Sequence, residues 1–417
     1  MKYTYQHTKY ACYTGYITQA IINNLSPLLF VIFQDAFGLT LPQITLLITL
    51  NFAVQMTVDL LCVRFIEKAG YRKSIVLAHF CAAAGLVGIC LFPLVMPAFM
   101  GLIIAAVISA VGGGLLEVLV SPIIEAIPGD KKESEMSLLH SFYCWGVLAV
   151  VLLSTGFFVL FGKQNWRALP LLWAIVPLLN AFFFQKVPVR QLVEDGQEMP
   201  LLKLLKTPVF WLFCVMMTAA GASELAMSQW ASLFAEEGLG VSKTVGDLMG
   251  PCCFAILMGT SRILFSRAKK MTTQRALLLS SLLCICCYLV TVFAPSPFIS
   301  LIGCAVCGFS VGVMWPGVFS LSSARLPTGG TKLFAFLAMF GDIGCCLGPS
   351  VVGLVSDGVL AQGASFLFPG AAGEALSQAA LKTGFSVASL FPLLLMAGVM
   401  LLTAAAMKGR EKNMKEM

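Results

Sequence analysis

The stretch Val111-Gly-Gly-Gly-Leu-Leu-Glu117-Val-Leu-Val-Ser-Pro-Ile-Ile-Glu125 closes a long apolar run that begins near Met100. It places the carboxyl group of Glu117 well inside a hydrophobic helix. A charged side chain at the centre of a membrane helix costs about 2.5–3.5 kcal/mol on insertion scales, so it usually faces a water-filled cavity or a partner inside a helix bundle. The glycines before it allow another backbone to approach closely. The stretch therefore predicts a membrane helix whose Glu117 lines a transport pathway.

The composition of the whole chain indicates that its solvent is lipid. Of the 417 residues, 59% are hydrophobic and 11% are charged, and the mean hydropathy is +0.90. A soluble domain is about 45–50% apolar and about 25% charged. The fifteen cysteines do not indicate disulfides, because most lie within apolar runs, where a thiol acts as a small hydrophobic group. Cys304-Ala-Val-Cys307 has the spacing of a redox or metal pair, but no histidine is near it, so we interpret it as packing.

Segments long enough to cross a bilayer recur along the chain. A spanning helix needs about 20 mostly apolar residues. The predicted spans are 11–33, 42–63, 74–95, 98–127, 138–161, 168–185, 208–234, 245–266, 276–294, 297–324, 331–358 and 383–407. We therefore predict an all-α membrane protein with twelve transmembrane helices in two pseudo-symmetric six-helix bundles. The bundles are 1–185 and 208–417, joined by a charged cytoplasmic central loop at 186–207, and a second polar loop is expected near 361–382.

Basic residues predict the orientation of these spans. With both termini in the cytoplasm, all but four of the 27 lysines and arginines fall in cytoplasmic segments. The four exceptions are Lys163, Arg167, Lys243 and Lys382. The excess of basic residues then faces the cytoplasmic leaflet, which explains the net charge of +7. We therefore expect the lipid bilayer as a partner and no nucleic acid. The expected location is the plasma or inner membrane, with several passes through it.

One loop resembles a signature of the major facilitator superfamily. Glu67-Lys-Ala-Gly70-Tyr-Arg72-Lys73 is similar to the acidic–basic–x–Gly–basic loop of that family. Such a loop needs a tight turn at Gly70 and cations, here Arg72 and Lys73, that pair with an acid or with helix ends. We interpret it, together with Asp59 near the inner membrane surface, as a cytoplasmic gate. The alternative is an ordinary positive-inside loop.

Four further segments resemble the fucose permease family of sugar:proton symporters. They are Gly114-Leu-Leu-Glu117-Val-Leu-Val-Ser-Pro122, Gly308-Phe-Ser-Val-Gly-Val-Met-Trp-Pro316-Gly-Val-Phe-Ser-Leu, Gly221-Ala-Ser-Glu224 with Trp230, and Asn23-Asn24-Leu25. The resemblance covers most of the chain. It implies alternating access to a site between two bundles, a sugar and a proton as cargo, and a monomer. The acid that this family carries in its first helix falls near Ser26 or Pro27 here, and neither can ionise.

Amide and carboxyl side chains recur at helical spacing within the first two predicted spans. They are Gln19 and Asn23, with Asn24 beside them, and Asn51, Gln55 and Asp59. Residues four apart share one face of a helix. A lipid-facing stripe of this kind would leave polar groups unsatisfied. We therefore expect a hydrogen-bonding wall for a sugar or polyol, or alternatively contacts between helices worth about 1 kcal/mol each.

Four titratable residues are candidates for proton coupling: Glu117, Glu224, Asp342 and His140. Burial disfavours a charged carboxylate, so Glu117 could be neutral in one conformation and charged in another; a permanently neutral structural acid is the alternative. A histidine can titrate near neutrality, which makes His140 a candidate. The alternative is that His140 only marks the end of a helix near the headgroups. Asp342 could instead form a buried pair, for example with Arg262.

Aromatic side chains are candidates for stacking on a sugar ring: Tyr143, Trp145, Trp230 and Trp315. Trp230 and Glu224 lie on different sides of one predicted helix. Both can line one cavity only if that helix is broken, and Gly221 would make a break possible.

These features predict a secondary transporter for a small polar solute, a sugar or sugar-like molecule, driven by protons. A second hypothesis is a proton-independent facilitator or antiporter of the same fold for another metabolite, drug or lipid-like substrate. A third, a membrane receptor or enzyme, finds the least support, because the chain lacks metal-ligand spacing, a phosphate-binding glycine loop and an ATPase motif. We therefore expect no metal and no cofactor.

Overall fold

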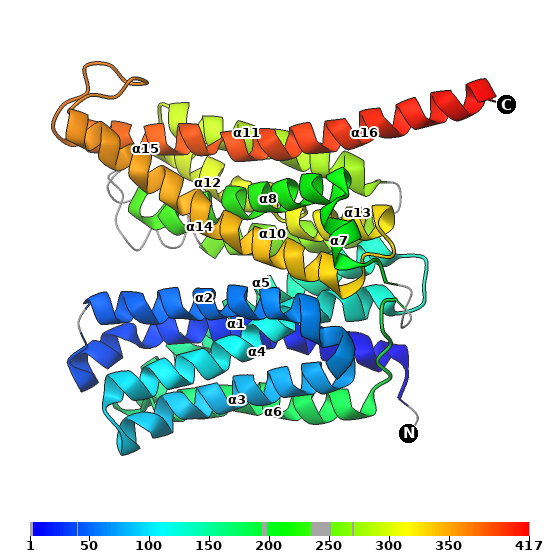
Figure 1. Cartoon of the computed structure of the whole chain (residues 1–417). Coiled ribbons are helices and arrows are strands. Elements are labelled where there is room, and N and C mark those ends of the chain that lie inside the picture. The colour runs from blue at the N-terminus through cyan, green and yellow to red at the C-terminus, as the bar shows by residue number, and fades with distance from the viewer. Residues whose placement is uncertain (1–2, 40, 194–197, 235–251, 269–270, 417) are drawn as a thin grey trace. The chain divides into compact units, whose positions relative to one another are not determined.

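The computed structural model describes residues 3–39, 41–193, 198–234, 252–268 and 271–416, and over these ranges it is built from helices joined by short connections (Figure 1). Two compact units divide the chain. Unit 1 is Met1–Leu201 together with Pro327–Met339, and unit 2 is Leu202–Leu326 together with Phe340–Met417. Each unit holds about half of the chain.

Unit 1 contains the helices that carry the first six predicted spans. They are α1 (Tyr5–Phe37), α2 (Leu41–Ala69), α3 (Tyr71–Val95), α4 (Ala98–Ala126), α5 (Lys132–Phe161), the 3₁₀ turn η1 (Lys163–Asn165) and α6 (Ala168–Lys186). Glycines in a left-handed conformation allow the sharp connections: Gly38 ends α1, and Gly70, with φ of 82°, separates α2 from α3.

Helix α4 packs against α1, α2, α3 and α5. Its glycines make this possible. A Cβ at Gly112 would lie 2.6 Å from the carbonyl oxygen of Ala78, and one at Gly114 would lie 3.0 Å from that of Gln55. The prediction that the triple glycine admits close neighbours is therefore confirmed. Glu117, one turn further on, lies within hydrogen-bond distance of Gln19 on α1.

Unit 2 carries the remaining spans. Its helices are α7 (Leu201–Leu205), α8 (Pro208–Leu233), α10 (Cys253–Arg267), α11 (Thr273–Phe293), α12 (Pro297–Val311), α13 (Met314–Arg325), α14 (Gly330–Gln362), α15 (Glu374–Ala388) and α16 (Leu390–Glu416). Leu201 of α7 and the first ten residues of α14 belong to unit 1 by their contacts.

The structure adds detail to the sequence predictions at three places in these helices. The predicted span 297–324 is found as one membrane-length segment, Pro297–Arg325, but it is interrupted around Gly312, where α12 ends and α13 begins. Part of the loop expected near 361–382 is helical, because α15 begins at Glu374. Finally, α8 is continuous at Gly221, which serves close packing instead: a Cβ there would overlap the carbonyl oxygen of Gly341.

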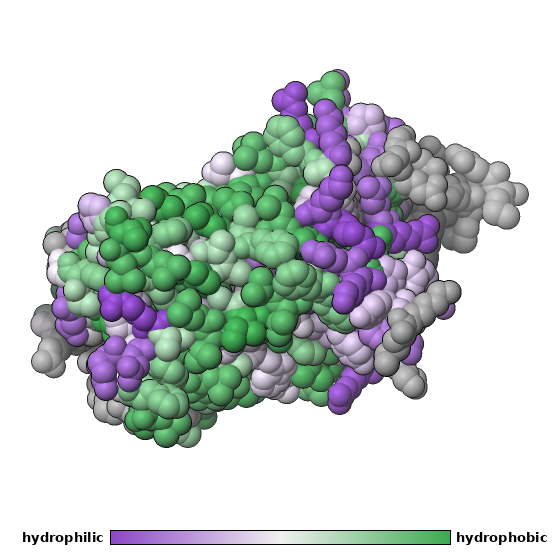
Figure 2. All heavy atoms as spheres, turned by 90° about the horizontal axis from the view of Figure 1, so that it is seen from below, coloured by the Kyte–Doolittle hydropathy of each residue, from purple (hydrophilic) through white to green (hydrophobic). Residues whose placement is uncertain are grey.

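Ten helical segments within the described ranges are long and apolar enough to cross a membrane. Helices α1 and α10 account for the other two predicted spans: α1 is 33 residues long but interrupted by amides, and α10 has 15 described residues. The prediction for 245–266 lies partly outside the described residues. Figure 2 shows apolar side chains across the middle of one face and hydrophilic side chains gathered toward its ends. Leu172 and Leu179 of α6 are more than half exposed, as lipid-facing residues are.

Candidate functional site

In unit 1, five polar side chains from α1, α2 and α4 form one hydrogen-bond network. The side-chain nitrogen of Gln19 donates to Glu117 Oε2 at 3.3 Å and to Gln55 Oε1 at 2.9 Å. Gln55 Nε2 donates to Asn23 Oδ1 at 3.0 Å, and Asn51 Nδ2 donates to the same oxygen at 3.3 Å. The residues that the sequence placed on two polar stripes therefore meet around the carboxyl group of Glu117.

Gly113 of α4 makes room for this network. A Cβ at this position would lie 3.1 Å from the side chain of Gln55 and 3.3 Å from that of Gln19. Any larger residue would push the two amides away from Glu117. Asn24, by contrast, donates to the carbonyl oxygen of Ala20 on its own helix at 2.9 Å and stays outside the network.

One buried acceptor of the network has no protein partner. Gln19 is 3% exposed, and its Oε1 atom accepts no hydrogen bond from any residue the structure describes. A buried amide oxygen without a partner is costly. It is therefore a position at which a hydroxyl group, from water or from a bound solute, would stabilise the unit.

A small cavity of about 50 Å³ adjoins the far end of the network. Asn23 and Asn51 line it, together with Ser26 and Ser109. The volume fits one or two water molecules. Ser109 Oγ is buried and has no hydrogen-bond partner within the described ranges. The network thus ends at a small cavity whose wall is mostly apolar, with the polar side chains of Asn23, Ser26, Asn51 and Ser109 within it.

A second cluster lies beside the first and contains His140. The hydroxyl of Tyr16 on α1 lies 3.0 Å from Ser121 Oγ on α4 and 3.2 Å from His140 Nε2 on α5. Ser121 Oγ is 3.4 Å from the same imidazole nitrogen. The ring of Tyr143 packs edge-on to Tyr16, with centroids 6.5 Å apart. Trp145 of α5 is half-buried and has no recorded polar contact with this cluster.

Tyr16 is not among the residues predicted from the sequence, although it lies three residues before Gln19, on the face of α1 predicted to make polar contacts. A tyrosine in an apolar run counts as hydrophobic, so the pattern does not mark its hydroxyl as polar.

In unit 2, Glu224 of α8 forms an ion pair with Arg262 of α10, with Arg262 Nη2 3.6 Å from Glu224 Oε2. Arg262 Nε also donates to the carbonyl oxygen of Gly312 at 2.8 Å. That carbonyl is available because Pro316, four residues later, has no N–H to donate. The arginine therefore pairs with a carboxylate and also supplies the hydrogen bond that the carbonyl oxygen of Gly312 lacks at the break between α12 and α13. Asp342 is buried, at 8% exposure, on α14.

The two tryptophans of unit 2 pack against α14. Trp230 Nε1 donates to the carbonyl oxygen of Pro349 at 3.0 Å, so its polar atom is occupied by backbone. Trp315 stands beside Gly341, where a Cβ would overlap the indole ring. Trp315 is half-buried and lies 6.2 Å, centroid to centroid, from Phe319.

The residues predicted to form a cytoplasmic gate differ in burial and in what they contact. Asp59 is fully buried and Lys73 is exposed. Gly70 makes the tight turn, and Arg72 donates to the carbonyl oxygens of Phe184 and Gln185 at 2.9 and 2.8 Å, at the end of α6. The side chain of Glu67 lies outside the described residues.

The same end of unit 1 holds contacts that the sequence did not predict. Tyr71 Oη lies 2.6 Å from Thr331 Oγ1, and Lys332 Nζ donates to Glu198 Oε2 at 3.2 Å. The backbone N–H of Met199 donates to the carbonyl oxygen of Thr328 at 2.7 Å. Residues 198 and 199 of the central loop therefore hydrogen-bond to the start of α14 and to the turn before it.

A family model for the Major Facilitator Superfamily matches residues 12–349. The chain belongs to this superfamily. Its members are membrane transporters rather than enzymes. The match covers both the Glu117 network and the Glu224–Arg262 pair, so both lie within a transporter scaffold.

Solved structures of superfamily transporters have the same fold. FucP, crystallised in the outward conformation, superposes with a TM-score of 0.78 at 17% identity, over 94% of this chain and 98% of that one. The proton:xylose symporter XylE superposes with a TM-score of 0.74 at 12% identity, over 92% and 94%. Membrane protein MosC of Rhizobium meliloti is 23% identical over 266 residues, and the match spans 63% of each chain.

Proposed function

We propose that this superfamily member is a secondary active transporter that moves a neutral, hydroxyl-rich solute, a sugar or polyol, by alternating access together with a proton. The observation that carries the proposal is the amide network around Glu117 with the unpartnered oxygen of Gln19. Amide groups both donate and accept hydrogen bonds, as the hydroxyl groups of a sugar do.

The charges of the described spans favour an uncharged solute over an organic anion. The network of unit 1 contains four amides and one carboxyl group. The buried arginine of unit 2, Arg262, already faces Glu224 at 3.6 Å. Binding an anion would require a cation that is free to pair with it, because an uncompensated buried charge is strongly destabilising.

Proton coupling is assigned to Glu117 because it is the ionisable member of the network. The N–H groups of Gln19 can donate to the carboxylate or to the carbonyl oxygen of the protonated acid, so the contact survives both states. Protonation leaves Glu117 with a hydroxyl that could donate to a solute. Two structurally similar proteins are described as symporters, FucP of fucose and protons and XylE of protons and xylose.

Transport of the same solute without protons is the second candidate. It is favoured by one observation: Ser26 and Pro27 line the cavity beside Asn23, where fucose permeases carry an acid in the first helix. A facilitator would use the amides for binding and Glu117 only as a hydrogen-bond acceptor.

The proposal is tested with purified protein in liposomes. Uptake of radiolabelled hexoses, pentoses and polyols is compared with uptake of organic anions and organic cations, with and without an inward proton gradient. We expect a neutral sugar or polyol to be accumulated only with the gradient. Accumulation of an anion or a cation would contradict the proposed solute class. Sugar uptake that is equal with and without the proton gradient would favour the facilitator.

A further inference from the structure

We propose that the proton carried by Glu117 leaves through unit 1 itself, along α1, by way of Tyr16, Ser121 and His140 to Glu135. The proposal rests on the proposed function and adds the residues that connect the carrier to water. Chains of acidic residues and histidines serve as proton relays in membrane transporters. The basic residues of the sequence assign the end of unit 1 at which α1 begins to the cytoplasm.

The upper part of the route runs from Glu117 to His140, and its first step, from the carboxyl group to the hydroxyls, spans one helical turn that an intervening water bridges. Ser121 lies one turn after Glu117 on the same face of α4, and Tyr16 lies one turn before Gln19, the partner of Glu117. The hydroxyls of Tyr16 and Ser121 lie 3.2 and 3.4 Å from His140 Nε2. All three side chains are at most 6% exposed. A hydroxyl both donates and accepts, so this group can pass a proton and return to its starting state.

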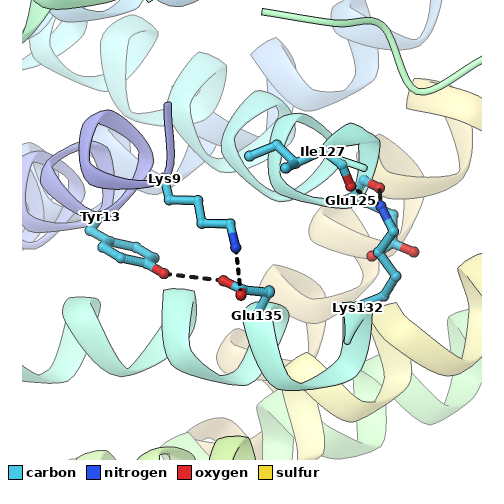
Figure 3. A network of polar contacts seen from close by, with 6 residues as sticks. All are labelled: Lys9, Tyr13, Glu125, Ile127, Lys132 and Glu135. Carbon is cyan, nitrogen blue, oxygen red and sulfur yellow. Dashed lines mark hydrogen bonds and ion pairs between the residues drawn. The ribbon is translucent and has the colours of Figure 1, made fainter. Parts of the chain in front are cut away.

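The lower part of the route joins this cluster to the surface. Tyr13, one turn before Tyr16 on α1, donates to Glu135 Oε2 at 3.3 Å, and Glu135 Oε1 pairs with Lys9 Nζ at 2.6 Å. Figure 3 shows Lys9 and Tyr13 of α1 both turned toward Glu135 of α5. One turn of α1, about 5 Å along its axis, separates the two parts, and an intervening water can bridge such a step.

Water reaches Glu135 at the end of this route. Lys9 and Glu135 line a cavity of about 260 Å³ with Asp130, Lys131 and Lys132. The cavity fits several water molecules. Its wall is fixed by Lys132, which donates to the carbonyl oxygens of Glu125 and Ile127 at the end of α4 (Figure 3). The Glu135 side chain is 26% exposed, so it can release a proton to solvent.

The steps balance in protons. Glu117 gives up one proton and becomes a carboxylate, while His140 accepts one through the hydroxyls and becomes an imidazolium. His140 then gives a proton through water and Tyr13 to the Glu135 carboxylate, and Glu135 releases it to water in the cavity. Tyr16 of α1 and Ser121 of α4 face the ring of His140. On α5 itself, Tyr143 packs against Tyr16, and Cys144 Sγ donates to the backbone carbonyl oxygen of His140. The charged groups at the open end are Lys9, Glu125, Asp130, Lys131, Lys132 and Glu135.

A second buried histidine of unit 1 supplies a matched control. His79 of α3 is 0% exposed, and its ring bonds the carbonyl oxygen of Ile75 at 2.7 Å and the amide of Asn180 at 2.8 Å. A backbone carbonyl and an amide do not relay protons as hydroxyls do. The two histidines are thus alike in burial and in residue type but differ in what they connect.

The test compares two activities of each variant in liposomes: accumulation of the transported solute driven by a proton gradient, and counterflow exchange of the same solute at equal pH on both sides. For His140→Gln and Glu135→Gln we expect the ratio of accumulation to counterflow to fall by about ten-fold or more, the scale of losing one proton-transfer group. For His79→Gln the ratio should match that of the wild type. If His140→Gln does not fold, Tyr16→Phe takes its place in the test. This variant keeps the ring and its packing, and it should also lower the ratio of accumulation to counterflow.

The outcomes separate this route from the proposed function. A wild-type protein that accumulates no solute under a proton gradient would overturn both. Loss of accumulation in Glu117→Gln with a wild-type ratio in the His140 and Tyr16 variants would overturn the route alone. An equal fall in the ratio for His79→Gln would also overturn it, because the effect would then reflect packing of the bundle.

Discussion

The side-chain nitrogen of Gln19 on α1 lies 3.3 Å from the carboxylate of Glu117 on α4, 98 residues later in the chain. The same nitrogen donates to Gln55 of α2 at 2.9 Å. One amide therefore connects three helices beside Glu117, the carboxyl group of this five-residue network. Its other polar atom, Oε1, faces no described partner. The contact can both position an acid and leave an acceptor for cargo.

Replacement of Gln19 by methionine should reduce both stability and uptake. The side chain has a similar length but offers no N–H to Glu117 or Gln55, and an unsatisfied buried polar group costs about 1–3 kcal/mol. We expect a lower melting temperature and loss of solute uptake. Thr14→Val is the control, because Thr14 donates only to the carbonyl oxygen of Tyr10 on its own helix. Wild-type uptake by the Gln19 variant would show that the amide has no part in binding.

Enlarging Gly113 should separate the two glutamines from the acid. A Cβ would lie 3.1 Å from the side chain of Gln55, and overpacking of a tight interior costs about 1–3 kcal/mol. We expect Gly113→Val to lower the melting temperature and to abolish uptake. Gly156→Ala is the matched control, since its Cβ would meet nothing within 4 Å and alanine is about 1 kcal/mol better than glycine in a helix. Equal melting temperatures for wild type and Gly113→Val would contradict the packing described.

Removal of Arg262 should destabilise unit 2 more than removal of its acid. Arg262→Ala leaves both Glu224 and the carbonyl oxygen of Gly312 without this donor, and breaking a buried pair costs about 3–5 kcal/mol. Glu224→Gln should be milder and should partly rescue Arg262→Ala, because it removes the uncompensated charge. A double-mutant cycle on thermal unfolding measures this coupling. Additive effects of the two substitutions would refute the pair.

The Glu198–Lys332 contact should tolerate exchange of its charges. Both side chains are largely buried, at 11% and 13% exposure, and they lie 3.2 Å apart. We expect Lys332→Glu to lower both the melting temperature and the transport rate, because it places like charges together. Adding Glu198→Lys should restore part of each, which thermal unfolding and uptake assays would detect. If the double variant is no better than the single one, this ion pair does not hold the start of α14.

The polar faces of the first two spans could be predicted from the sequence because their amides recur at helical spacing in apolar runs. Gln19 and Asn23, and likewise Asn51 and Gln55, share faces that cannot be exposed to lipid. The cluster around His140 could not be assembled in this way. Tyr16 contacts residues 105 and 124 positions away, and neither spacing nor hydropathy marks its hydroxyl as polar.

The differences from the sequence predictions also have physical reasons. Gly221 makes a break in its helix possible, but a small residue serves equally to let α14 approach, and local sequence does not separate the two. The break near Gly312 depends on Pro316 and on Arg262, which is 50 residues earlier and replaces the lost backbone hydrogen bond. A proline alone predicts a kink; the partner that stabilises it is known only from the fold.

Proton movement during solute uptake tests the central claim most directly. Wild-type protein in liposomes, in weakly buffered medium with a pH electrode outside, should raise the external pH when the transported sugar or polyol is added. Glu117→Gln protein, reconstituted at the same density, should not. Uptake of the solute by the wild type without any pH change, or an equal pH change with Glu117→Gln, would contradict the assignment of Glu117 as the proton carrier.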